Sequence, residues 1–254
     1  MLRTELTNYL SSFLNINTFK DYAPNGLQVE GGQEVNTIVT GVTACQALID
    51  EAIALKADAL LVHHGFFWKN EPEVITGMKQ KRIKALLENN INLYGYHLPL
   101  DAHPEVGNNV ELGRQLKFDN IEAVDNIAGL STPGLLWKGT LPEKMLATEF
   151  SGLLEAVLDR KALHLGDENQ MIASVAWCTG GAQDYIDLAA QLGVDAFISG
   201  EASERTFHCA IEQHIHYFSA GHHATERYGI QALGRHLEAQ FGLTHHFIDI
   251  DNPV

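Results

Sequence analysis

The sequence predicts an α/β fold built from two related α/β lobes, each with a mainly parallel sheet flanked by helices. Short β-branched and apolar runs alternate with helical patterns in both halves of the chain, which is typical of parallel strand-helix-strand units. The second half also repeats residues of the first at a constant spacing. With 254 residues, 45% of them hydrophobic, the chain can bury the cores of two lobes, which we place at residues 1–120 and 121–254.

The first lobe is expected to begin with an amphipathic helix over residues 2–14, where leucines recur at helical spacing. A turn-rich stretch over residues 21–32 follows it. Beyond this stretch, apolar strands alternate with helical patterns up to a loop at 97–109: strand 37–42, helix 47–55, strand 59–62, helix 79–88 and strand 91–95.

The second lobe repeats this plan after a middle region with weaker strand signals. There we expect strands at 135–140 and 162–165, with a helix between them that starts near Pro142. The remaining strands are expected at residues 174–178, 196–199, 216–219 and 246–250. They alternate with helices, and one of these helices begins after Gly221.

The repeat can be followed residue by residue. Matching residues recur at an offset of 137 positions: Asp58 and Asp195, Ile38 and Val175, Gln46 and Gln183. Farther along the chain the offset is 125 positions: His97 and His222, Asp101 and Glu226. The second copy is therefore expected to carry a net deletion of 12 residues (137 less 125) in the loop after His64.

Composition and motif content disfavour several classes of protein. The formal charge of -15, from 32 acidic and 17 basic residues, disfavours extended binding to nucleic acid. The three cysteines are widely spaced, without a CxxC pair, as in proteins of reducing compartments. No signal peptide or membrane-spanning apolar stretch is present, so we expect a soluble, cytoplasmic protein. GxSxG, GxxxxGK and GxGxxG motifs are also absent, which disfavours serine hydrolase and nucleotide-loop chemistry.

Two histidines follow directly on a predicted buried strand. His63 and His64 precede Gly65 at the carboxyl end of that strand, where ligands bind in parallel sheets. Adjacent residues of a regular strand point to opposite faces, but Gly65 can break the strand and let both rings serve one site. We expect one imidazole for each of two metal ions.

A second group of donors follows the helical period. His222 and Glu226 are four residues apart after a glycine, so they share one face if a helix begins there. Asp101 lies just beyond the third strand of the first lobe. These donors are too few to close two coordination shells, which leaves positions for water or substrate, as in catalytic sites. A metal-dependent hydrolytic enzyme is therefore the predicted class.

The remaining histidines are assigned weaker roles. His97 matches His222 in the repeat and so occupies the position of a ligand. Two roles stay open for it: it could support the ligands or act as the catalytic base. His223 is turned about 100° from His222 on a helix, which favours support or packing over ligation. The others are expected to be structural or at the surface: His103, His164, His208, His214, His216, His236, His245 and His246.

Four segments of the chain resemble the motifs of the Nif-three-like proteins, also called GTP cyclohydrolase I type 2 homologues. They are PNGLQVEG at 24–31, VHHGFFWK at 62–69, HLPLDAHPEVGNN at 97–109 and GHHATERYG at 221–229. The resemblance extends through both predicted lobes. It implies a Nif-three-like fold of two related α/β lobes, a dinuclear metal centre in the cleft between them, and a ring-shaped homohexamer.

The resemblance also implies a ligand set and an activity. Carried over onto the matching positions, the ligands are His63, His64, Asp101, His222 and Glu226, with Glu226 bridging both ions. His223 departs from the family, which often has an aromatic residue there. Imidazole and carboxylate ligands suit iron, manganese, zinc or nickel. We expect a dinuclear metal-dependent hydrolase, of the GTP cyclohydrolase I type 2 class, that acts on a nucleotide or related small molecule with His97 as the proton shuttle.

Two other functions are compatible with this site. A ring-shaped metal-containing protein could bind or regulate a nucleic-acid or protein partner, which predicts a basic inner rim. The local basic cluster that the sequence offers for such a rim consists of Lys79, Lys81, Arg82 and Lys84. Metal storage or delivery would instead predict weakly held, exchangeable ions without turnover. No membrane partner is expected.

Overall fold

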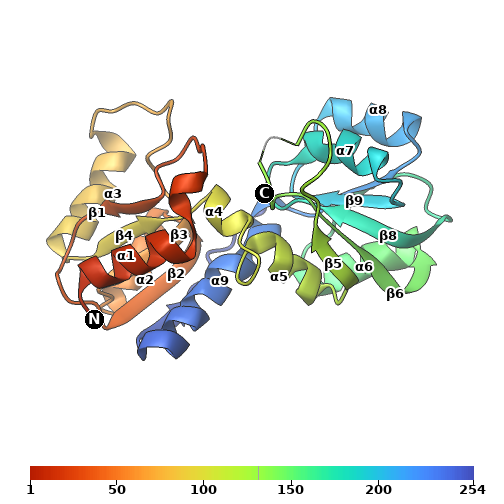
Figure 1. Ribbon diagram of the computed structural model, residues 1–254. Coiled ribbons are helices and arrows are strands. Elements are labelled where there is room, and N and C mark those ends of the chain that lie inside the picture. The colour runs from red at the N-terminus through yellow and green to blue at the C-terminus, as the bar shows by residue number, and fades with distance from the viewer. Residues whose placement is uncertain (131) are drawn as a thin grey trace. The chain divides into compact units, whose positions relative to one another are not determined.

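The computed structural model describes residues 1–130 and 132–254, which form two compact units. The first unit combines Met1–Leu100 with Gly229–Asp251, and the second combines Asp101–Tyr228 with Asn252–Val254. The predicted α/β fold class is confirmed, because each unit has a sheet flanked by helices (Figure 1). The division differs from the boundary placed at residues 120 and 121, because the last strand pairs within the sheet of the first unit.

The first unit holds a five-stranded sheet in the order β1-β4-β3-β2-β11. Strands β4, β3, β2 and β11 are parallel, and β1 lies antiparallel to β4 at one edge. The bounds are α1 Arg3–Phe13, the short 3₁₀ helix Ile16–Thr18, β1 Gly26–Val29, β2 Thr37–Thr43, α2 Gln46–Ala54, β3 Ala59–His64, α3 Gly77–Glu88, β4 Asn92–Gly95, α4 Leu98–Asp101, α9 His222–Phe241 and β11 Thr244–Phe247. Helices α4 and α9 both cross the division between the units.

The second unit holds a six-stranded sheet in the order β5-β6-β8-β9-β10-β7. Its central strands β8, β9 and β10 are parallel, whereas the pairings toward both edges are antiparallel. The bounds are α5 Asn108–Gln115, β5 Asp119–Ala123, β6 Trp137–Leu146, α6 Ala147–Leu158, β7 Leu163–Leu165, β8 Met171–Trp177, the 3₁₀ helix Gln183–Tyr185, α7 Ile186–Gln191, β9 Ala196–Ser199, α8 Glu204–Glu212 and β10 His216–Ser219.

Each unit has a core that follows from its strand sequences. In the first, β-branched and leucine side chains of β2 and β3 pack against α2, and Val39, Leu60 and Leu48 are almost completely buried. In the second, aromatic rings fill the core, and Trp177 lies 5.2 Å from Phe118 between ring centroids. Burial of such side chains stabilises the fold by about 1.5 to 3 kcal/mol each.

The hydrogen bonds of the two units repeat each other. The Oδ2 atom of Asp58 accepts from the backbone N–H groups of Asn36 and Thr37, at 2.8 and 2.9 Å. The Oδ2 atom of Asp195 accepts in the same way from Ala173 and Ser174, at 3.0 and 2.8 Å. The strand registers agree as well, since β2 and β3 pair with the same relative register as β8 and β9. The predicted offset of 137 therefore matches equivalent backbone pairings.

The offset at the third strand of each repeat differs from the predicted value of 125. Val62 pairs with Gly95 and Ser199 with Ser219, so β4 and β10 are 124 positions apart. His97 therefore corresponds to Gly221, and one more residue precedes His222 in the second unit. Gly221 has φ of +99°, a conformation that side-chain-bearing residues rarely adopt, and it leads directly into α9. The predicted offset of 125 was therefore wrong by one residue.

Other differences concern short or interrupted elements. The turn-rich stretch contains β1, and the predicted loop at 97–109 contains α4 and the start of α5. Helix α6 begins at Ala147 and not near Pro142, because β6 continues through the proline. The β6 to β8 register is interrupted between Thr140 and Met145, so the missing N–H of Pro142 falls at an irregularity. Among the described helices, none is long and apolar enough to cross a membrane.

Replacement of Asp195 by Asn is expected to destabilise the second unit by about 1 to 3 kcal/mol. The neutral amide of Asn accepts weaker hydrogen bonds from backbone N–H groups than the carboxylate does. Burial raises the pKa of Asp195, but the bonds from Ser174 and Ala173 outweigh it and lower the pKa below its ordinary value. The stabilisation is thus present above the unfolded pKa of about 3.9 and is lost as the pH falls through the lower folded pKa. Urea denaturation at about pH 7 and about pH 3 measures this difference, with the exposed Asp251→Asn as control. Equal stability of Asp195→Asn and wild type at about pH 7 would contradict it.

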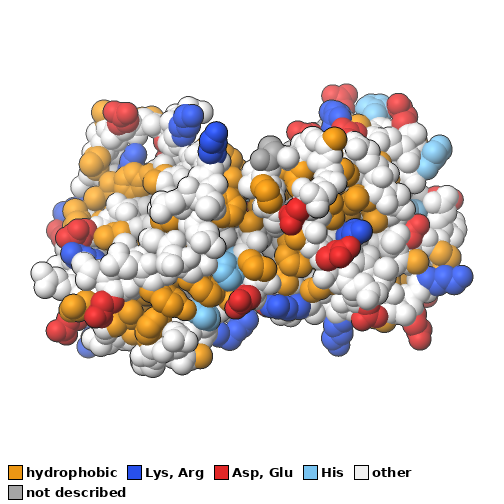
Figure 2. Space-filling view, in the orientation of Figure 1, with side chains coloured by type: hydrophobic (Ala, Val, Ile, Leu, Met, Phe, Trp, Pro, Cys, Tyr) orange, Lys and Arg blue, Asp and Glu red, His pale blue; other side chains and the backbone are white. Residues whose placement is uncertain are grey.

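Charged side chains are dispersed on the visible surface. On the face drawn in Figure 2, Lys and Arg side chains are scattered among acidic and apolar groups and do not form one continuous patch. Together with the net charge of -15, this dispersal gives no support on that face to an extended phosphate-binding surface.

Candidate metal centre

The first unit gathers three imidazoles. His63 and His64 end β3, and His97 follows β4, its parallel neighbour. A ring nitrogen from each lies within 4.8 Å of the other two, and the ring centroids of His63 and His64 are 4.4 Å apart. The strand ends thus bring the rings together, as the rule for parallel sheets predicts. Adjacent positions on β3 do not keep the two rings apart, because the strand ends at His64.

The rings of this group are held by protein oxygens. The Nδ1 atom of His63 lies 2.9 Å from the carbonyl oxygen of Tyr96, and that of His64 lies 3.3 Å from Oγ1 of Thr43. Because a carbonyl only accepts, Nδ1 of His63 must donate, which gives the lone pair of the neutral ring to Nε2. Oriented imidazoles of this kind are characteristic of metal ligands. His63 is 1% exposed, so its position is fixed by packing as well.

Asp21 performs the same task for His97. Its Oδ1 atom accepts from Nδ1 of His97 at 2.9 Å, and its Oδ2 atom accepts from Asn25 at 2.9 Å and from the backbone N–H of Leu98 at 3.1 Å. Burial raises the pKa of Asp21, but the hydrogen bond and charge of His97, with the other two donors, lower it to about 2. Asp21 is therefore a carboxylate over the physiological range.

The second unit gathers two carboxylates and one imidazole. Helix α9 begins at His222, and the predicted pairing on its first turn is confirmed, with Nε2 of His222 lying 3.2 Å from Oε2 of Glu226. A carboxylate oxygen of Asp101 lies within 4.8 Å of one of Glu226. Asp101 and Glu226 are 6% and 2% exposed. Two buried carboxylates at this separation repel each other unless a proton or a cation lies between them.

Asp101 is held by polar side chains of its own unit. Its Oδ1 atom accepts from Nδ2 of Asn108 at 2.8 Å and from Oγ1 of Thr179 at 3.4 Å. The backbone oxygen of Asp101 accepts from Asn109 at 3.2 Å. Burial and the negative charges of Asp101 and Glu226 raise the pKa of the Cys178 thiol well above its ordinary value. Without a bound metal ion, the Cys178 thiol is therefore neutral.

His222 lies between two carboxylates. Its Nδ1 atom is 2.6 Å from Oε1 of Glu201, which follows β9. Burial lowers the pKa of His222, but the hydrogen bonds and charges of Glu226 and Glu201 outweigh it and raise the pKa to about 9. The metal-free imidazole is therefore protonated near neutral pH, and binding of a cation by Nε2 must release that proton.

Gly180 is required by the close packing around this pair. It has φ of +69°, and a Cβ atom at this position would overlap Oε1 of Glu226 and lie 3.1 Å from Nε2 of His222. The Gly180-Gly181 turn, which follows β8, thus leaves room for the two donors.

Sequence reasoning missed Asp21, Thr179 and Glu201. Each acts through a partner that is distant in sequence, so spacing along the chain gives no direct signal. For Glu201 the repeat held a signal, because the offset of 137 places it at the position of His64. The first unit thus has the imidazole of His64 at the position where the second unit has the carboxylate of Glu201, which orients His222.

Replacement of Glu201 by Ala is expected to weaken metal binding about 10- to 100-fold, because His222 loses the partner that orients Nδ1. Glu201→Gln keeps an accepting oxygen and is expected to retain most of the affinity. Titration of metal-free protein with Zn²⁺ by calorimetry measures the effect. The exposed Glu204→Ala is the matched control, and an affinity of Glu201→Ala equal to that of this control would contradict the role.

Four of the remaining histidines have local contacts in the described part of the chain. Nδ1 of His103 accepts from the backbone of Glu105 and Val106, at 3.2 Å each. His164 and His216 stack with ring centroids 5.3 Å apart. His223 is 7% exposed, and its backbone N–H donates to the oxygen of Val254 at 2.9 Å.

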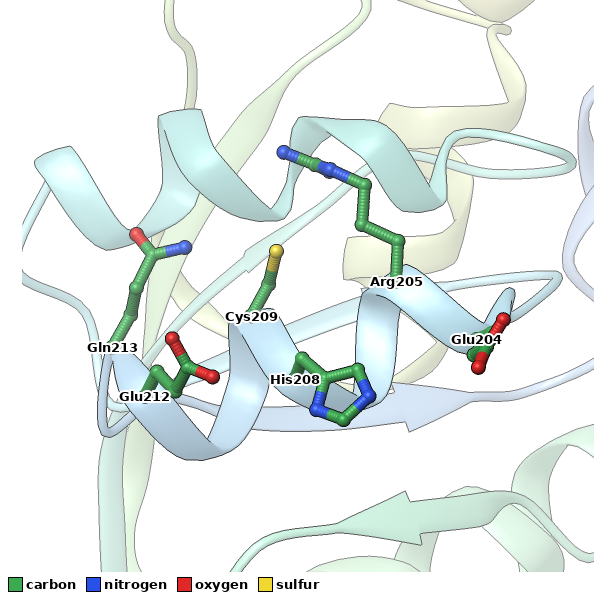
Figure 3. A pocket seen from close by; sticks show the side chains of 6 residues that line it. All are labelled: Glu204, Arg205, His208, Cys209, Glu212 and Gln213. Atoms are coloured by element: carbon green, nitrogen blue, oxygen red, sulfur yellow. The ribbon is translucent and has the colours of Figure 1, made fainter.

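A surface cavity of about 360 Å³ lies along α8 and contains none of the predicted site residues (Figure 3). Its lining residues are Glu204, Arg205, His208, Cys209, Glu212 and Gln213. Arg205 contacts Asp184 of the 3₁₀ helix Gln183–Tyr185 and Asp187 of α7, so its charge is already paired there. The cavity therefore offers no centre comparable to the imidazole and carboxylate groups.

The fold and these side chains define a class of protein, with two α/β units that each carry donors suited to a divalent metal ion. A sequence model described as Duf34/NIF3 (NGG1p interacting factor 3) matches residues 1–253. The chain belongs to the DUF34/NIF3 family.

Relatives match the chain over its whole length. A protein of Vibrio cholerae is 54% identical over 256 residues and one of Yersinia pestis is 52% identical over 255, each covering 100% of both chains. Both are named GTP cyclohydrolase 1 type 2 homolog. A solved structure named "Structural genomics, protein ybgI, unknown function" is 52% identical, covers 100% of both chains and has a TM-score of 0.93.

Proposed function

We propose that the protein is a dinuclear metal-dependent hydrolase that acts on a nucleotide or a related small molecule. The orientation of the imidazoles carries this proposal. In His63, His97 and His222, Nδ1 faces an oxygen that can only accept, either a carbonyl or a carboxylate. Each neutral ring therefore has its lone pair on Nε2, the state required of a metal ligand or a proton acceptor.

The proposed ligands come from both units. They are His63, His64, Asp101, His222 and Glu226, with Glu226 bridging two ions. The first unit alone offers three imidazoles, and the second alone offers two carboxylates and one imidazole. Either set has too few donors for two ions, so we propose that the two sets act together. Mixed nitrogen and oxygen donors support iron, manganese, zinc or nickel. When bound, the two ions supply Lewis acidity and lower the pKa of a water molecule near neutrality.

His97 is proposed as the catalytic base. Since Asp21 accepts from Nδ1, Nε2 of His97 is the atom that takes the proton from the attacking water. The carboxylate of Asp21 then stabilises the imidazolium that forms. The lowered pKa of Asp21 supports this role, because it keeps a negative charge beside Nδ1 of His97.

The name of the relatives supports a cyclohydrolase-like reaction on a nucleotide. The ring-shaped homohexamer and the cytoplasmic location also belong to this proposal. Light scattering at a mass six times that of the chain tests the assembly. The three cysteines, which are free in the structure, are consistent with a reducing compartment.

A regulatory role with a nucleic-acid partner finds less support. The basic cluster predicted for it lies on α3, and its side chains have local contacts. Lys79 lies over the ring of Phe67 and Lys84 pairs with Glu88 at 3.5 Å. We therefore favour the enzyme over the binding protein.

Metal analysis of protein purified without chelator tests the proposal. About two equivalents of ion per chain are expected, and removal with a chelator should abolish hydrolysis in a panel of nucleotides. Restoring the ions should restore the activity. Protein without bound metal, or a reaction that is unchanged by the chelator, would contradict the proposal.

A further inference from the structure

We infer that Tyr22 and Trp68 form a stacking platform for the nucleobase of a free nucleotide, beside the imidazoles of the first unit. The two ring centroids lie 5.8 Å apart with the planes inclined by 30°. Tyr22 is 56% exposed, whereas the adjoining His97 is 7% exposed. The inference deepens the proposed function, on which it rests, by naming the substrate group that the protein recognises.

The platform is attached to the proposed catalytic residue. Both rings meet His97 edge-on, Tyr22 with centroids 4.9 Å apart and Trp68 with centroids 5.3 Å apart. Trp68 also lies 5.7 Å from His64 between centroids. A planar ring stacked on this pair would therefore lie within about one ring width of the imidazoles.

Hydrogen bonds hold the platform in place. The backbone N–H of Lys69 donates to the oxygen of Tyr22 at 2.8 Å, which joins the two loops that carry the rings. Asp21, which orients His97, also accepts from the backbone N–H groups of Tyr22 and Ala23, at 2.7 and 3.2 Å. A preformed platform of this kind lowers the entropic cost of binding a flat ligand.

The geometry favours stacking on the outside of the pair. The rings are already in contact, so a third ring cannot fit between them without moving the loops. An exposed aromatic face beside a polar centre suits a nucleobase, because every base has a π-face that stacks on aromatic side chains. The net charge of -15 disfavours a nucleic-acid strand and favours a single nucleotide.

Fluorescence of the metal-free protein titrated with GMP tests the inference. The other tryptophans, Trp137 and Trp177, are 6% and 0% exposed, so quenching by a stacked base reports mainly on Trp68. Ribose 5-phosphate has the sugar and charge but no base, and it is expected to cause no quenching. Since metal is absent, failure of the dinuclear proposal would leave this result unchanged.

Matched variants identify the platform. Tyr22→Phe keeps the ring and is expected to bind GMP within about twofold of wild type, whereas Tyr22→Leu should bind at least about fivefold more weakly. Calorimetry with Trp68→Leu should show a similar loss. Equal affinities of Tyr22→Phe and Tyr22→Leu would overturn the inference, as would ribose 5-phosphate binding as tightly as GMP. A short single-stranded oligonucleotide that binds more tightly than GMP would overturn the assignment to a free nucleotide.

Discussion

Replacement of Glu226 by Gln is expected to remove hydrolysis and to lower the metal content from about two equivalents to less than one. Glu226 is the proposed bridging ligand, and an amide oxygen is neutral and a much poorer ligand than a carboxylate. The fold should persist, because Gln has the same shape and relieves the repulsion between Asp101 and Glu226, whose oxygens lie within 4.8 Å of each other. Metal analysis and thermal unfolding of the purified variant measure both effects.

The control for this variant lies on the same helix. Glu238 is exposed near the end of α9, so Glu238→Gln should leave metal content and hydrolysis unchanged. If Glu226→Gln retained two ions per chain, the bridging role would be wrong. Loss of metal together with loss of the cooperative unfolding transition would instead assign Glu226 to the stability of the second unit.

Replacement of His97 by Gln is expected to lower the rate of hydrolysis about 10²- to 10⁴-fold while the metal content stays the same. The variant loses the base, but it keeps a side chain that can donate to Asp21. Single-turnover rates of metal-restored protein, measured beside the ion content, check this expectation. Loss of an ion in His97→Gln would make His97 a ligand, since its ring nitrogen lies within 4.8 Å of those of His63 and His64.

The control for this variant is the same substitution at a histidine outside the imidazole group. His103 is buried and its Nδ1 atom accepts from the backbone N–H groups of Glu105 and Val106, so His103→Gln changes a buried histidine of the second unit that is not a member of the imidazole group. Its rate per bound metal is expected to equal that of wild type.

The sequence predicted those parts of the site that depend on local periodicity. His222 and Glu226 meet because four residues make about one turn of a helix, and this spacing is visible in the chain. His63 and His64 follow an apolar run that could only be a buried strand or helix, and its length favoured the strand.

The parts that the sequence did not predict depend on contacts between distant residues. Asp21 reaches His97 across 76 positions, and no pattern near either residue indicates the bond. Helix α5 begins at Asn108, directly after Gly107, where two asparagines indicate a loop. The tertiary contacts outweigh these local preferences, because Asn109 accepts from the backbone N–H of Thr179 at 3.0 Å and Asn108 binds Asp101.

The boundary between the units also depends on tertiary pairing. The last strand follows the second repeat in sequence, but β11 pairs with β2, more than 200 positions earlier. Hydrophobic patterns identify strands and do not specify their partners. The equivalence of the repeats was predictable at the first two strands, whereas the third required the strand register.

Anomalous diffraction from crystals of the metal-loaded protein tests the central claim most directly. The account predicts two metal peaks, with Nε2 of His63 and a carboxylate oxygen of Glu226 each within about 2.0 to 2.2 Å of an ion. Peaks that contact donors of one unit alone, with no ion shared between the histidines of the first and the carboxylates of the second, would contradict it.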